Sequence, residues 1–166
     1  EKYNISITPY NIEAIVGEYD APEKQEQGIV KYNFLDDGNT LIYGNDGAEK
    51  EMLLNTIIYS TCKYHGAEEI NYYIIDYGSE TLRRFLGLPL VGGIVFQGEE
   101  EKYNNLLKLL REELTRRKSL FVDSGGSYLN YIKTAENKLP VISVIINNFD
   151  SLYGSNPNLY EEISDL

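Results

Sequence analysis

Residues 40–61, TLIYGNDGAEKEMLLNTIIYST, decide the fold that the sequence predicts. The stretch begins with a short apolar run at residues 41–43, which predicts a strand, and continues into a turn that contains Gly44 and Gly47. After the turn, apolar residues recur at the spacing of one helix face: Leu53, Leu54, Ile57 and Ile58. The order of strand, glycine turn and helix predicts one unit of an α/β fold.

This layout is typical of a phosphate-binding P-loop, G-x-x-x-x-G-K-[ST], in which backbone N–H groups surround phosphate oxygens at a helix N-terminus. Gly44 and Lys50 stand at the first glycine and at the lysine of the motif. Glu49 replaces the second glycine, and Glu51 replaces the hydroxyl residue that binds magnesium. Both replacements oppose nucleotide binding, because each adds a negative charge where phosphate would lie.

We therefore interpret the turn as a degenerate nucleotide site, and expect no bound cofactor. Its candidate residues are Gly44, Asn45, Asp46, Gly47, Ala48, Glu49, Lys50 and Glu51. A strand, turn and helix with no ligand explains the pattern equally well, since glycine and lysine at this spacing also occur by chance. In either case we expect Lys50 to pair with a carboxylate of Asp46, Glu49 or Glu51 instead of a phosphate.

Length and composition indicate one soluble globular domain over residues 1–166, with lead-in strands and a loop at 1–35 and a core at 36–166 that is truncated at its C-terminus. The net charge of −11 argues against a nucleic-acid or anionic-membrane surface. One cysteine and one histidine exclude an internal disulfide and predict no metal site. With no apolar run long enough to span a bilayer, we expect a cytoplasmic fragment of a longer protein.

The remaining periodicity predicts buried strands at 70–75, 94–96 and 141–146, and helices at 81–86, 99–121 and 128–134. Residues 87–93 read as a proline and glycine connection, and residues 156–166 as the start of another helix. His65 is expected beside the C-terminal end of the helix that begins near Ala48. Arg116 and Arg117 either balance the dipole of their helix or form an interface.

Four phrases together resemble the FtsK/SpoIIIE-type ATPase modules, most closely those of the EssC/EccC motors of type VII secretion. They are DAPEKQEQ from Asp20, YIIDYGSETL from Tyr73, GLPLVGG from Gly87 and ELTRRKSLF from Glu113. The resemblance covers residues 12–153 and suggests the middle or last module. It implies a three-layer, RecA-like P-loop NTPase fold with a mostly parallel central sheet.

The resemblance places the family's Walker B acid, which holds magnesium, at Asn147. Asn148 follows it, and Asp150 lies about 10 Å further along an extended chain, so it is too distant to substitute. Together with Glu49 and Glu51, these residues imply an ATPase fold without catalytic residues.

The leading hypothesis is a degenerate ATPase-like module that acts in motor assembly, regulation or substrate recognition. Its expected partners are neighbouring modules of the motor chain and secreted substrates, with an oligomer possible in a motor that is anchored in the membrane outside this fragment. An active module that binds ATP and magnesium to drive export is the alternative, and a DNA translocase module is the third hypothesis.

Overall fold

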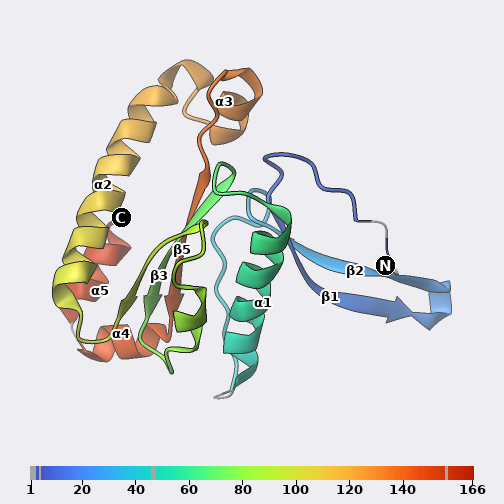
Figure 1. Ribbon diagram of the computed structural model, residues 1–166, viewed down its shortest axis with the longest axis horizontal. Coiled ribbons are helices and arrows are strands. Elements are labelled where there is room, and N and C mark those ends of the chain that lie inside the picture. The colour runs from blue at the N-terminus through green and yellow to red at the C-terminus, as the bar shows by residue number, and fades with distance from the viewer. Residues whose placement is uncertain (1–2, 4, 46–47, 156) are drawn as a thin grey trace. The chain divides into compact units, whose positions relative to one another are not determined.

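The computed structural model describes residues 3, 5–45, 48–155 and 157–166. The chain forms two compact units, Glu1–Ile70 and Asn71–Leu166 (Figure 1). Among the residues described, no helix combines the length and the apolar character that crossing a membrane requires.

The first unit is built from an antiparallel hairpin and one long helix. Strand β1 (Glu13–Ala21) pairs with β2 (Glu26–Asn33), and only a short 3₁₀ turn, η1 (Pro22–Lys24), separates them. The polar stretch that begins at Asp20 therefore forms the ends of both strands as well as the turn between them. Helix α1 (Ala48–Tyr64) packs on β1, with Ala14 and Ile58 fully buried.

The prediction of a strand at residues 41–43 is wrong. These residues have no regular secondary structure, and the side chains of Leu41 and Tyr43 are 79% and 88% exposed. A strand forms only where a neighbouring strand satisfies its backbone groups, and this segment belongs to neither sheet. A turn lies before it, in which the Asn33 side-chain oxygen accepts hydrogen bonds from the N–H groups of Leu35 and Asp36.

The second unit holds a three-stranded parallel sheet in the order β4-β3-β5, which confirms the predicted α/β class (Figure 1). Strands β3 (Ile70–Asp76) and β5 (Val141–Asn147) match their predicted positions. The other elements, in chain order, are η2 (Thr81–Phe85), β4 (Val91–Phe96), α2 (Glu100–Leu120), η3 (Val122–Ser124), α3 (Tyr128–Thr134), α4 (Phe149–Ser155) and α5 (Pro157–Ser164).

Helix α2 supplies the helical half of the second unit's core. Its buried residues recur at three- and four-residue spacing and pack with strand and α4 residues in one cluster: Ile75, Tyr77, Val95, Tyr103, Leu106, Leu107, Leu110 and Leu152. Burying each such side chain stabilises the fold by about 1.5–3 kcal/mol. The amphipathic helix predicted at 99–121 is confirmed.

Two elements of the second unit differ from prediction. Strand β4 begins at Val91, so the glycine pair read as a connection lies inside it. A Cβ on Gly92 would lie 2.7 Å from the Tyr73 ring, so the glycine leaves room for that ring on the neighbouring strand. Helix α4 was not predicted at all. It begins after Asn148, whose carbonyl accepts hydrogen bonds from the N–H groups of Ser151 and Leu152.

Candidate nucleotide site

In the P-loop-like stretch, residues 44 and 45 precede α1, and residues 48–51 begin that helix. Gly44, Asn45, Ala48 and Glu49 are exposed, and Lys50 and Glu51 are half-buried, whereas Asp46 and Gly47 lie outside the described residues. The Lys50 ammonium donates a hydrogen bond to the Gly44 carbonyl oxygen, 3.4 Å away. This carbonyl is one partner of Lys50, and the pairing with a carboxylate stays a prediction, because Asp46 lies outside the described residues.

Glu49 and Glu51 both lie in the first turn of α1. Carboxylates there interact favourably with the positive end of the helix dipole, by about 0.3–1 kcal/mol each. The same dipole and N–H groups would otherwise favour a phosphate. The two acids therefore fill the electrostatic role of an anion at this helix end, and the residues present do not fit a magnesium–nucleotide complex well.

In the second unit, Asp76 forms the centre of a polar cluster at the carboxyl ends of β3 and β5. Its side chain is fully buried. One carboxylate oxygen accepts hydrogen bonds from the Asn147 side-chain N–H, at 2.9 Å, and from the Gly78 backbone N–H, at 3.0 Å. The other accepts from the Leu82 N–H at 3.4 Å. Three N–H donors suit a charged carboxylate, which has only acceptors.

The loops that follow β3 and β5 are also joined through their backbones. The Tyr77 N–H donates to the Asn147 carbonyl oxygen, and the Asn148 side chain donates to the Tyr77 carbonyl oxygen. Asn148 has a φ of 59°, a left-handed conformation that asparagine tolerates better than most residues. Asn147 and Asn148 therefore both serve to connect the two loops. In open α/β sheets, ligands bind at this edge.

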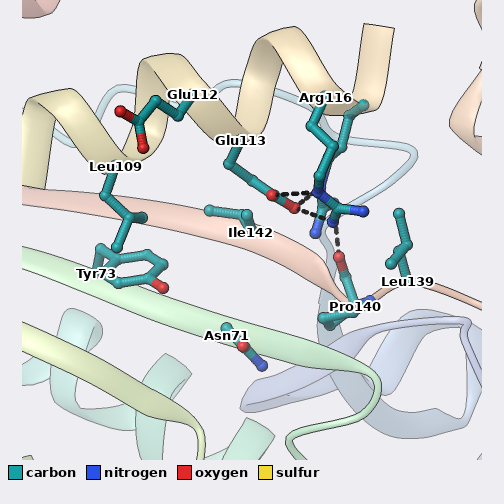
Figure 2. A pocket seen from close by; sticks show the side chains of 10 residues that line it. Asn71, Tyr73, Leu109, Glu112, Glu113, Arg116, Leu139, Pro140 and Ile142 are labelled. Atoms are coloured by element: carbon teal, nitrogen blue, oxygen red, sulfur yellow. Dashed lines mark hydrogen bonds and ion pairs between the residues drawn. The ribbon is translucent and has the colours of Figure 1, made fainter. Parts of the chain in front are cut away.

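Arg116 and Arg117 lie near the C-terminal end of α2 and share the Glu113 carboxylate, and Figure 2 shows Arg116 beside Glu113. Both donate hydrogen bonds to Glu113 at 2.6–2.7 Å. The Arg116 hydrogen bonds, followed by those of Arg117, lower the pKa of Glu113 from 4.5 to about 2. Arg117 also donates to the Pro140 carbonyl oxygen at 2.7 Å. Arg117 is therefore mainly structural, and the interface role of both arginines stays a prediction.

A groove of about 460 Å³ adjoins this arginine pair, between α2 and the start of β5 (Figure 2). Leu109 and Tyr73 lie on one part of it, and Arg116 lies on another. Its lining residues are Asn71, Tyr73, Leu109, Glu112, Glu113, Arg116, Arg117, Leu139, Pro140 and Ile142.

His65 is buried and connects the end of α1 to β1. Its Nε2 accepts a hydrogen bond from the Glu13 backbone N–H at 3.3 Å, so its proton lies on Nδ1, which donates to Glu69 at 3.1 Å. The Glu69 carboxylate also accepts from the Tyr10 N–H at 2.7 Å. The histidine is near the helix end as expected, but its partners are β1 and Glu69, which sequence reasoning missed.

Comparison with known proteins gives the family. The FtsK/SpoIIIE family model matches residues 15–161. The chain is 30% identical over 149 residues to the ESX secretion system protein EccC of Geobacillus thermodenitrificans, and 32% identical over 132 residues to YukB of Bacillus subtilis. These alignments cover 89% and 79% of the chain but only 10% and 9% of the relatives, so the chain spans about a tenth of their length.

Solved structures of the same kind of protein are also similar to this chain. EssC ATPases 2 and 3 from Geobacillus thermodenitrificans superpose with a TM-score of 0.84 at 28% identity, over 98% of this chain and 31% of that one. Thermomonospora curvata EccC, ATPases 2 and 3 in complex with a signal sequence peptide, gives a TM-score of 0.82 at 22% identity, over 95% and 30%. The expected RecA-like fold is thereby confirmed. The chain belongs to the FtsK/SpoIIIE family, and the relatives that it resembles are EssC/EccC secretion proteins.

Proposed function

We propose that this chain is a degenerate ATPase-like module of a type VII secretion motor, which keeps its fold without nucleotide and acts in assembly, regulation or substrate recognition. The observation that carries the proposal is the Asn147 amide. At the position of the family's magnesium-binding acid, this amide donates a hydrogen bond to buried Asp76. An amide N–H repels a cation, because its partial charge has the same sign.

The P-loop turn supports the same conclusion. Lys50, which would reach the outer phosphates, is directed to the Gly44 carbonyl. Glu49 and Glu51 stand in the first turn of the helix. A unit charge against a phosphate charge at about 4 Å costs roughly 1 kcal/mol in water and about 4 kcal/mol where water is partly excluded. Two such charges cost roughly 2–8 kcal/mol in total, whereas about 4 kcal/mol separates a micromolar site from a millimolar one.

Isothermal titration of the chain with ATP and MgCl₂ tests the proposal. We expect no binding at micromolar nucleotide. Micromolar binding that disappears in Lys50→Ala would reject the degenerate module and favour the active ATPase that drives export. The Lys50→Ala control matters, because nucleotide bound elsewhere on the surface would survive the substitution.

The proposed partners are neighbouring modules of the same motor chain and secreted substrates. Relatives carry several ATPase modules in one chain, and the Thermomonospora curvata relative was solved with a signal sequence peptide. We place the module in the cytoplasm, as in the solved cytoplasmic domain of EssC. A pull-down with flanking modules and secreted substrates tests the partners, and failure to retain any of them would count against this role.

DNA translocation is disfavoured by the net charge of −11, since DNA binding requires a basic surface that displaces counterions. A gel shift with duplex DNA at low ionic strength separates the two functions. A shift that weakens steeply as salt is added would support the DNA hypothesis.

A further inference from the structure

We propose that Asn147 is a positioning residue: its amide donates to Asp76 and so holds the loops after β3 and β5 together. Where two carboxylates face each other, a divalent cation can hold them together, and here the Asn147 amide has that role. The inference rests on the proposed function in one respect only: the loops at this edge of the sheet are ordered without bound nucleotide.

The first step is the geometry of the two loops. The loop after β3 is attached to the Asp76 carboxylate through the N–H groups of Gly78 and Leu82. The end of β5 reaches the same carboxylate through the Asn147 side chain. The carboxylate is thus a common acceptor for both loops, and Asn147 is the donor that brings β5 to it.

The second step is burial. Asp76 is 0% exposed and Asn147 is 6% exposed, so solvent competes little for either side chain. In such surroundings a hydrogen bond to a charged group is stronger than one in water, and leaving the carboxylate without one of its donors costs more. The contact between Asp76 and Asn147 is therefore expected to govern the order of both loops.

The third step is charge. An aspartate at position 147 would place a carboxylate oxygen where the amide nitrogen now lies, 2.9 Å from an oxygen of Asp76. Two carboxylates at this distance repel, and a hard divalent cation, which takes carboxylate oxygens as ligands, relieves the repulsion. In the wild-type chain the order of the two loops should not depend on a cation, whereas in Asn147→Asp the loops should need a divalent cation to become ordered.

The test measures hydrogen exchange of residues 77–82 and 148–152, and the thermal midpoint, with and without millimolar MgCl₂ and in the absence of nucleotide. We expect the wild-type chain to be unaffected by MgCl₂. Asn147→Asp should exchange about tenfold faster or more without the cation and recover with it. Asn147→Ala, the matched control, should also exchange faster, but without any recovery in MgCl₂.

The double variant Asp76→Asn with Asn147→Asp restores one amide and one carboxylate in reversed positions. We expect it to be more stable than Asn147→Asp alone, and this holds even if the single variant fails to fold. The inference is overturned if Asn147→Asp behaves like Asn147→Ala in both conditions, or if the double variant is no more stable than the single one. Nucleotide binding by the wild-type chain would reject the proposed function while leaving these outcomes to decide the inference.

Discussion

The Arg117 guanidinium donates a hydrogen bond to the Pro140 carbonyl oxygen at 2.7 Å, and thereby joins the end of α2 to the residue before β5. The same guanidinium donates to Glu113 at 2.7 Å. Its side chain is 12% exposed, whereas that of Arg116 is 50% exposed. Two adjacent arginines on one helix therefore differ in their contribution to stability.

Replacing Arg117 should destabilise the chain far more than replacing its neighbour. We expect Arg117→Ala to lower the free energy of unfolding by about 2 kcal/mol, because a partly buried carbonyl and carboxylate each lose a charged donor. Arg116→Ala should cost at most about 1 kcal/mol, as is usual for an exposed ion pair. Urea unfolding of both variants checks this. Equal losses would contradict the structural role of Arg117.

The free energy of unfolding should fall in acid, because Glu113 becomes protonated and loses its pairing with the two arginines. Its pKa is lowered from 4.5 to about 2 in the folded chain, first by Arg116 and then by Arg117. A lowered pKa gives stability that is fully present above pH 4.5 and is lost as the pH falls toward 2. After allowance for solvent screening, we expect this loss to be about 1–2 kcal/mol.

Denaturant unfolding at several pH values measures that loss, and Glu113→Gln is its control. The variant has no group to titrate at this position, so its stability should change less between pH 4.5 and 2. A variant with the same pH dependence as the wild-type chain would assign the acid sensitivity to other carboxylates.

His65→Phe should loosen the attachment of β1 to α1. The substitution removes the acceptor of the Glu13 N–H and a donor to Glu69, and leaves both groups buried or half-buried without these partners. We expect a loss of about 2–4 kcal/mol and faster exchange of the Glu13 amide. Glu68→Ala, exposed in the same turn, should change stability by less than about 0.5 kcal/mol. An unchanged Glu13 exchange rate would contradict the assigned hydrogen bond.

Restoring the P-loop should restore some nucleotide affinity. We expect Glu49→Gly with Glu51→Ser to bind ATP at least about tenfold more tightly than the wild-type chain, because two charges that oppose the phosphates are removed. Glu23→Gln with Glu26→Gln, both exposed on the hairpin, makes the same change in net charge away from the turn. Similar affinities for the two double variants would show that only net charge matters.

Elements with a strong local pattern were predictable from sequence. Helix α2 follows from the spacing of its leucines, and α3 is capped by Ser127, whose hydroxyl accepts the Asn130 N–H. Strands β3 and β5 follow from continuous runs of apolar residues. The family resemblance also came from sequence alone, since each of its four phrases is a continuous run of residues. In each case, residues close together in the sequence carry the signal.

The sequence alone thus predicted where the buried strands lie, close to their ends at Asp76 and Asn147, and showed that acids replace the second glycine and the hydroxyl residue of the P-loop motif. Only the tertiary structure decided that these two strand ends meet, that Arg117 reaches Pro140, and that residues 41–43 form no strand. Asp76 and Asn147 are 71 residues apart, and Arg117 and Pro140 are 23 apart. Such contacts depend on which strands become neighbours in the sheet, which no local pattern encodes, because the energy that selects the neighbours comes from packing the whole core.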